Sequence, residues 1–220
     1  MRELVIFGAG QIAEVAHYYF TAEGARPVAA FTVDAQFRQA GAVLGVPVVD
    51  FERVQDLYPP DSYDMFVAVS FRQVNKFRMQ KVAEAEAKGY ALASHVSPKA
   101  AVWNGFVLQP NTIIMEHNVI QPFVTVGRNV TMWSGNHIGH HSTIGDHCFI
   151  ASQAVISGSC TIGDGCFIGV NATVRDGISI GAHAVIGAGA LVLASAPDEA
   201  VLIAQAATMS KVPSSRLRSI

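Results

Sequence analysis

The chain has 220 residues, of which half are hydrophobic and only 15% are charged, and its formal net charge at pH 7 is −2. A balance so close to neutral offers no electrostatic attraction to nucleic acid or to an anionic membrane, so we expect neither as a partner. The apolar run before Gly10 is too short for a signal peptide, and the stretch 188–209 is broken by a proline and two acids. We therefore expect a cytoplasmic protein.

Apolar runs alternate with helical patterns over residues 1–94. We predict strands over residues 4–8, 28–33, 65–69 and 90–93, and helices over residues 11–23, 51–57 and 73–88. This alternation predicts an open, parallel α/β sheet of the Rossmann-like kind.

The first strand leads into a glycine turn, residues 8–13, that opens a helix. Glycines let backbone amides approach a phosphate, and the N-terminus of the helix adds a positive dipole end. Asp34 follows the second strand, where an acidic residue commonly receives a hydroxyl or base edge of a nucleotide. We expect a nucleotide-linked substrate here rather than a dinucleotide, because about 95 residues hold only one mononucleotide-binding half. The predicted substrate-binding residues are Gly8, Gly10, Gln11, Ile12 and Asp34. A plain strand-to-helix turn is the alternative.

From Val96 to Val192 every sixth residue is a large aliphatic. A period of six fits neither a helix nor an ordinary strand, and it is typical of a parallel β-helix built from hexapeptides. The residue two before each aliphatic is usually small, and both are expected to point inward. With three hexapeptides to a coil, residues eighteen apart stack on their neighbours. The expected organisation is an α/β domain over 1–94, a β-helix over 95–195 and a C-terminal tail over 196–220.

The outward positions of this β-helix include Phe123, Trp133 and Phe149, which predicts burial between identical subunits. The cysteines all fall on the small inward position: Cys148, Cys160 and Cys166. We expect buried, reduced thiols there, because free cysteine is among the residues most often buried. The chain has no C-x-x-C pair that would indicate zinc.

A glycine-turn α/β domain followed at once by hexapeptides resembles the hexapeptide-repeat sugar acyltransferases over nearly the whole chain. That family includes sialic-acid O-acetyltransferases, UDP-4-amino-sugar N-acetyltransferases of the bacillosamine pathway and GDP-perosamine N-acetyltransferase. The resemblance implies a left-handed β-helix and a homotrimer with acetyl-CoA bound between neighbouring β-helices. It also implies a sugar linked to UDP, dTDP or GDP on the N-terminal domain, a role in polysaccharide biosynthesis, and no metal.

The run from His137 to Asp146 matches the family's catalytic motif, and the resemblance places the general base on His140. A histidine of near-neutral pKa is suited to take a proton from an attacking amine or hydroxyl. The side chain should project from the coil, and Gly158, one coil later, leaves room beside it for a pantetheine arm. The acid that follows the family histidine is His141 here, so His141 shares the orienting task or another residue performs it.

The coenzyme is expected, by register with the family, to meet backbone amides of Phe149, Gly158 and Gly169. A zinc cluster is the rival interpretation of the histidines. We expect His140 and His141 to diverge and His147 to lie on another face, which disfavours metal binding. Ile12, Glu14 and Trp133 depart from the histidine, lysine and asparagine that many family members carry, and these changes leave the acceptor sugar open.

The leading hypothesis is an acetyl-CoA-dependent N-acetyltransferase acting on a nucleotide-linked 4-amino-4,6-dideoxy sugar, with His140 and His141 as catalytic residues. An amine depends less on an assisted base than a hydroxyl does, which favours N-acetylation where the acid is missing. The open alternatives are O-acetylation of the sialic-acid type, transfer of another acyl group, and a non-catalytic scaffold or sugar-nucleotide sensor. The nucleotide, the sugar epimer and the glycan that receives the product also stay open.

Overall fold

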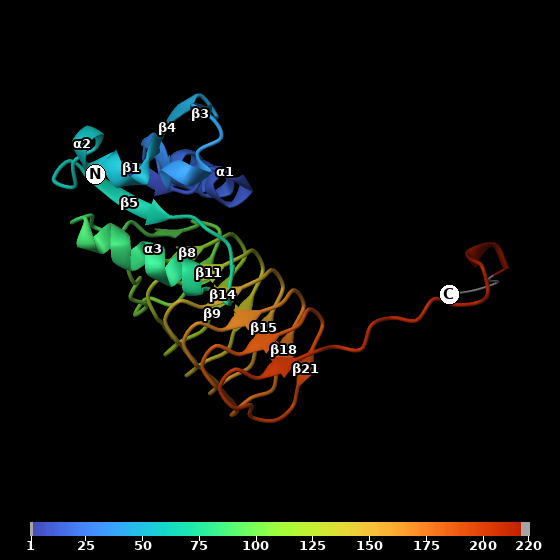
Figure 1. Cartoon of the computed structure of the whole chain (residues 1–220). Coiled ribbons are helices and arrows are strands. Elements are labelled where there is room, and N and C mark those ends of the chain that lie inside the picture. The colour runs from blue at the N-terminus through green and yellow to red at the C-terminus, as the bar shows by residue number, and fades with distance from the viewer. Residues whose placement is uncertain (1, 217–220) are drawn as a thin grey trace.

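A computed structural model describes residues 2–216, so the last four residues of the expected tail lie outside it. The α/β unit sits at one end of a β-helix, and the C-terminal segment extends away from the other end (Figure 1). None of the helices within residues 2–216 is both long enough and apolar enough to cross a membrane.

The N-terminal sheet has the strand order β3-β4-β2-β1-β5. Its strands are β1 (Glu3–Phe7), β2 (Val28–Val33), β3 (Ala42–Val43), β4 (Val46–Asp50) and β5 (Tyr63–Val67). All pairs are parallel except the short β3–β4 hairpin, which the sequence did not predict. The expected parallel α/β sheet is confirmed, although the strand expected over 90–93 forms only a single bridge, from Leu92 to Met65.

Helices cover both sides of this sheet because its strands are apolar on both faces. The α-helices are α1 (Gln11–Tyr18), α2 (Val54–Leu57) and α3 (Lys76–Ala87). The 3₁₀-helices are Ala35–Phe37, Phe51–Arg53 and Ser214–Arg216, and a π-helix over Tyr19–Glu23 continues α1. On the β1 strand, Leu4 and Ile6 face the side of α1, whereas Val5 and Phe7 face the side of α3. The helix expected from residue 73 begins three residues later.

The second half is a parallel β-helix of two-residue strands in three sheets, which confirms the architecture expected from the repeats. Face one contains β6 (His95–Val96), β8 (Ile113–Ile114), β11 (Thr131–Met132), β14 (Phe149–Ile150), β17 (Phe167–Ile168), β20 (Val185–Ile186) and β22 (Val201–Leu202). Face two contains β7 (Ala101–Val102), β9 (Val119–Ile120), β12 (His137–Ile138), β15 (Val155–Ile156), β18 (Thr173–Val174) and β21 (Leu191–Val192). Face three contains β10 (Thr125–Val126), β13 (Thr143–Ile144), β16 (Thr161–Ile162) and β19 (Ser179–Ile180).

Register along the faces follows the repeat, so that Ile138 pairs with Ile156 and Ile150 pairs with Ile168, eighteen residues on. These aliphatic side chains are fully buried and form one continuous core. Leu108 breaks the pattern, because it lies outside any strand and is 37% exposed. At the other end β22 pairs with β20, so the paired coils continue past residue 195.

Between residues 111 and 189, every corner of the β-helix turns through a left-handed residue, three positions after the aliphatic. The φ of this residue lies between 53° and 79° at all of these positions: 111, 117, 123, 129, 135, 141, 147, 153, 159, 165, 171, 177, 183 and 189. Glycine and asparagine adopt such a φ most readily, and they occupy seven of the positions. Four of the others are histidines, namely His117, His141, His147 and His183.

The cysteines are buried as expected, and each thiol donates to a carbonyl oxygen of the next coil. The expectation for the outward aromatic residues is only partly right. Phe123 is 59% exposed, but Phe149 is 3% exposed and Trp133 packs against the core of the α/β domain. The α/β domain of the same chain, rather than an identical subunit, covers these two side chains.

Candidate functional site

A cavity of about 540 Å³ opens at the carboxyl ends of β1, β2 and β5. In an open α/β sheet, ligands bind at this edge, where the strand order reverses. The glycine turn forms one wall, and Asp34 and the segment after β5 form the others. The structure thus brings together all five residues that the sequence predicted for substrate: Gly8, Gly10, Gln11, Ile12 and Asp34.

The first residue of the glycine turn, Gly8, must lack a side chain for steric reasons. Gly8 has a φ of 120°, and a Cβ there would lie 2.5 Å from the carbonyl oxygen of Ala68. Gly10, in contrast, faces open space, and it precedes α1 without a side-chain cap on the helix. The first N–H groups of an α-helix have no partner within the helix, so they stay available to a bound group.

Asp34 does not present a free carboxylate to the cavity. Its Oδ1 accepts a hydrogen bond from Nζ of Lys81 at 2.7 Å, and both side chains are almost fully buried. Lys81 also donates to Glu84 at 2.7 Å. Burial alone would lower the pKa of Lys81, but its hydrogen bonds to Asp34 and Glu84 raise it. The ion pair therefore fixes Asp34 as a rigid anion in the cavity wall.

Three further residues line the cavity and were not predicted from the sequence, namely Ser70, Arg72 and Phe77. Ser70 and Arg72 belong to the segment between β5 and α3, and Phe77 lies in the first turn of α3. A polar or cationic residue just after a buried strand was the available signal, because it lies at the ligand-binding edge of the sheet.

His140 lies at the corner between face two and face three, directly after β12. Its ring packs over the backbone of Gly158, where a Cβ would lie 2.7 Å from Cε1 and 2.8 Å from Nε2. The lack of a side chain at Gly158 therefore makes room for the imidazole of His140, and the expected room for a pantetheine arm beside it stays a prediction. The backbone N–H of His140 donates to Oε1 of Gln121 at 2.9 Å.

His141 turns back toward His140, so the expectation that the two rings diverge is wrong. Their Nδ1 atoms lie 3.1 Å apart, and their rings meet edge to face at 84°. The cause is the left-handed φ of 59° at His141, one of the corner positions. A hydrogen bond between two imidazole nitrogens needs one proton between them, so one Nδ1 donates and the other accepts.

His147 lies at a different corner, between faces three and one, and its Nδ1 is 2.8 Å from Nδ2 of Asn129. Burial lowers the pKa of His147. Across residues 2–216, no three histidine, cysteine, aspartate or glutamate side chains are grouped closely enough to hold a metal ion.

The residues expected to contact the coenzyme do not form one group. Phe149 is buried on face one, and its N–H donates to the carbonyl oxygen of Cys166. The N–H of Gly169 donates to Ile186 at 2.7 Å, at the corner between faces one and two. Only Gly158 lies at the corner of His140.

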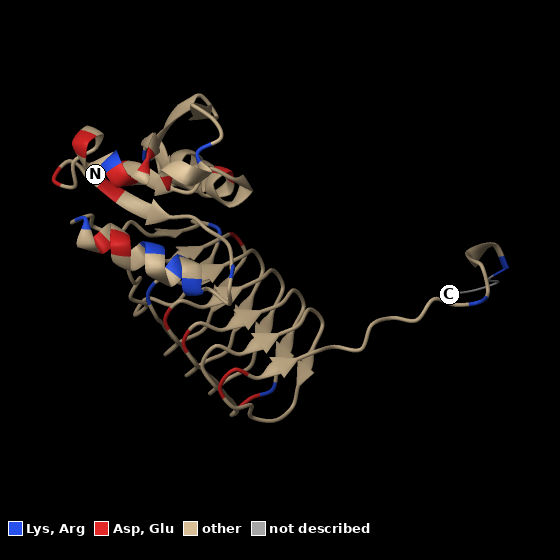
Figure 2. Ribbon diagram, viewed as in Figure 1, with Lys and Arg blue, Asp and Glu red and all other residues tan. Residues whose placement is uncertain are grey.

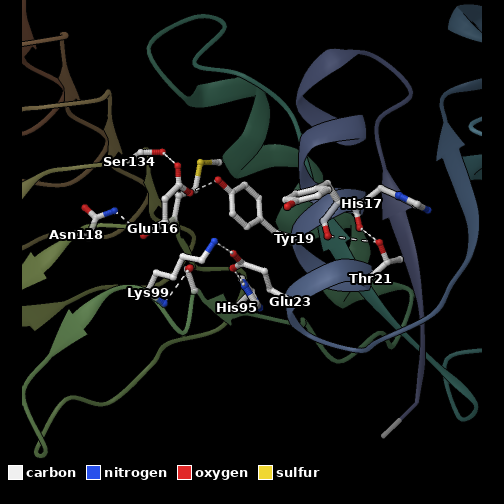
Figure 3. Close-up of polar contacts among 12 residues, drawn as sticks. His17, Tyr19, Thr21, Glu23, His95, Lys99, Glu116, Asn118 and Ser134 are labelled. Carbon is white, nitrogen blue, oxygen red and sulfur yellow. Dashed lines mark hydrogen bonds and ion pairs between the residues drawn. The ribbon is translucent and has the colours of Figure 1, made fainter.

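The π-helix joins the two domains through a polar cluster (Figure 3). The hydroxyl of Tyr19 donates to the carboxylate of Glu116, which also accepts from Oγ of Ser134 at 2.6 Å. Burial and the neighbouring Glu116 raise the pKa of Tyr19 well above its usual range. Beside this cluster, His95 lies 3.3 Å from Glu23. Because these groups partner one another, the cluster is a joint between the domains.

Helix α3 forms a second joint, and it carries charges along its length beside an almost uncharged face of the β-helix (Figure 2). Arg78, which is 1% exposed, donates to the hydroxyl of Thr131 and to the carbonyl oxygens of Asn129, His147 and Cys148, at 2.8–3.3 Å. Burial lowers the pKa of Arg78 to about 10, so its guanidinium keeps its charge at neutral pH.

Residues 123–158 and 159–194 match the family described as bacterial transferase hexapeptide (six repeats). Over nine-tenths of its length the chain is similar to perosamine N-acetyltransferase from Caulobacter crescentus. A variant of that enzyme with one histidine replaced by asparagine, in complex with CoA and GDP-perosamine, is 28% identical, with a TM-score of 0.82 over 90% of this chain and 92% of that chain.

A second similar structure is the acetyltransferase domain of PglB from Neisseria gonorrhoeae. It is 26% identical, with a TM-score of 0.80, and the match covers 91% of this chain and 96% of that one. No curated protein matches the chain. Residues 123–194 thus carry the bacterial transferase hexapeptide repeat, and the chain is similar over both domains to these two acetyltransferases.

Proposed function

We propose that the protein transfers an acetyl group from acetyl-CoA to the amino group of a nucleotide-linked 4-amino-4,6-dideoxy sugar. The observation that carries this proposal is the His140–His141 pair at a corner of the acyltransferase β-helix. The cavity at the glycine turn suits a nucleotide, and the similar Caulobacter enzyme was solved with CoA and GDP-perosamine.

We also propose a Rossmann-like fold for the N-terminal domain, a hand for the β-helix and an oligomeric state. The parallel strands have the spatial order 3-2-1-4, counted along the chain as β1, β2, β4 and β5, which supports a Rossmann-like domain. We propose a left-handed β-helix and a cytoplasmic homotrimer, with an α/β domain close to 1–94 and a β-helix that extends past the expected boundary at 195 as far as β22. Exposed apolar side chains on face two support association between subunits, namely Val119, Val155 and Leu191.

In the proposed reaction, Nε2 of His140 takes a proton from the amino group as its nitrogen attacks the thioester carbonyl. The new N–C bond forms, the C–S bond breaks, and the leaving thiolate of coenzyme A takes up the proton. Acyl transfer of this kind needs a base, which His140 supplies without a metal.

His141 takes the place of an acidic partner in this scheme. If Nδ1–H of His140 donates to Nδ1 of His141, the lone pair of His140 stands on Nε2, where a base needs it. A neutral imidazole stabilises the imidazolium of His140 less than a carboxylate would. This weaker assistance favours an amine over a hydroxyl as the acceptor, so O-acetylation is the second candidate.

The test is release of coenzyme A from acetyl-CoA with UDP-, dTDP- and GDP-linked 4-amino sugars and with free sialic acid. We expect turnover of one amino sugar and a loss of at least about 100-fold in kcat for His140→Ala. His117→Ala is the matched control, because His117 is an exposed histidine at another corner of the β-helix. Turnover of a hydroxyl acceptor alone would move the enzyme to O-acetylation, and full activity in His140→Ala would reject the proposed base.

Two neighbouring substitutions test the geometry of the base. Gly158→Ala places a methyl group where the ring of His140 now lies, so kcat should fall while the protein stays folded. His141→Ala should lower kcat by about tenfold or more, and it should change the pH profile of kcat because His140 loses its partner. Unchanged pH profiles would show that His141 has no orienting role.

A further inference from the structure

The segment between β5 and α3 contains the one run of consecutive left-handed non-glycine residues within residues 2–216. Gln73, Val74 and Asn75 are consecutive residues with φ values of 55°, 51° and 65°. Each left-handed non-glycine residue costs roughly 1–2 kcal/mol, and a β-branched residue such as Val74 is a particularly rare case. Strain of this kind persists only where the surrounding structure holds it, and it is concentrated at functional sites.

The surrounding structure that holds this turn is the β-helix. Asn75 is fully buried, and its Nδ2 donates to the carbonyl oxygens of Gly165 and Cys166 at 2.9 and 3.1 Å. The ring of Phe71 packs against those of Phe149 and Phe167, with centroids 5.2 and 4.4 Å away. The segment is thus anchored on both sides of Arg72.

Arg72, between these anchors, lines the cavity of the glycine turn. It is the only cationic residue among those that line this cavity. Over residues 2–216 its guanidinium has no hydrogen bond or ion pair, and it lies 5.7 Å from the ring centre of Phe77. The only acid in the lining, Asp34, is paired with Lys81, which it shares with Glu84. Arg72 is therefore the charged side chain of the lining whose donors remain available to a bound anion.

We infer that Arg72 binds the diphosphate of the nucleotide-linked substrate, opposite the amides of the glycine turn. This inference rests on the proposed function. A planar guanidinium matches phosphate oxygens with two parallel hydrogen bonds, and it is favoured for phosphate recognition. The glycine turn contributes no basic side chain, since Ile12 and Glu14 follow Gly10. Because Phe71 and Asn75 anchor the strained turn on the β-helix, the position of Arg72 is fixed relative to the proposed site of acyl transfer.

Calorimetric titration of the full chain with GDP, UDP and dTDP, and with the corresponding nucleosides, tests this assignment. We expect Arg72→Gln to lower the affinity for the diphosphate that the wild type prefers by at least about tenfold. The affinity for the corresponding nucleoside should stay within about twofold. Arg72→Lys should keep part of the affinity, because it keeps the charge but loses the paired hydrogen bonds. Arg53→Gln is the matched control, since Arg53 is an exposed arginine of the same domain outside the cavity.

The assignment would be overturned if Arg72→Gln lowered the affinities for nucleoside and diphosphate equally, or lowered neither. It would also be overturned if the wild-type protein bound none of the three diphosphates. The proposed function fails separately: if the diphosphate binds through Arg72 but no amino sugar releases coenzyme A, Arg72 keeps its role and the acetyl transfer is rejected. Conversely, amino-sugar turnover with an unchanged KM in Arg72→Gln would reject only the role of Arg72.

Discussion

The β-helix and the α/β domain bury their polar groups in different ways. In the β-helix most buried polar side chains are amides and hydroxyls, and several of them bond to backbone groups of the same or the next coil. Asn136, for example, donates to Trp133 and accepts from the N–H of Ala154. The α/β domain instead buries charges, as in the pairs Lys81–Asp34 and Arg26–Asp64. Substitutions should therefore have small, local effects in the coils and large effects at the buried charges.

The largest effect is expected at Arg78, which links α3 to three carbonyl oxygens of the β-helix. Arg78→Met fills a similar space but removes every donor, so buried acceptors lose their partners. We expect the free energy of unfolding to fall by about 3 kcal/mol, measured by urea denaturation. Arg53→Met, at an exposed site, should change it by less than about 0.5 kcal/mol. A loss below about 1 kcal/mol for Arg78→Met would show that the other contacts suffice to hold α3.

A smaller effect is expected at Ser142, inside the β-helix. Its hydroxyl donates to the carbonyl oxygen of Ser157 and accepts from the N–H of Cys160. Ser142→Ala should cost about 1 kcal/mol. Ser142→Cys should cost less, because Cys148 already makes the same bond to a carbonyl fifteen residues on, as a thiol. If both variants cost the same, the hydrogen bond is not what selects these small polar residues.

The smallest effect is expected from the titration of His95. Burial lowers the pKa of His95 below its ordinary 6.5, although the hydrogen bond to Glu23 acts in the opposite direction. The unfolded chain therefore takes up this proton at higher pH than the folded protein, and stability falls as the pH drops below about 6.5. His95→Gln should lessen the fall in Tm between pH 7.5 and 5.5. An unaltered pH dependence would assign the effect to other groups, such as His147.

The repeats made the β-helix predictable. Each coil contacts only the neighbouring coils, so the residue pattern that specifies it is local in the sequence. The left-handed corners could also have been read from the sequence, since asparagine and glycine recur at that position of the hexapeptide. That reading would have corrected the expectation for His141, whose side chain the corner turns back toward His140. The place of the glycine turn and Asp34 in the cavity was predictable for the same reason, because each directly follows a strand in the sequence.

The contacts between the domains could not be predicted in this way. Arg78 is one of several charged residues of α3, and nothing in the spacing of that helix says which one is buried. The left-handed turn before α3 is set by Asn75 reaching residues 90 and 91 positions away. Phe149 followed the repeat pattern, but its burial depends on Phe71, which lies in the other domain. Such long-range pairs leave no periodic trace in the sequence.

The eighteen-residue register has a consequence for how the molecule could change in length. Each coil adds about 4.8 Å along the axis, and a whole coil inserted after Gly177 would leave every pair between residues 95 and 174 in place. The histidine corner and the joints to α3 would keep their positions, while the far end of the molecule would move outward by one step. The β-helix can thus be lengthened at its C-terminal end in units of one coil, without any change to the corner of His140 or to the contacts with α3.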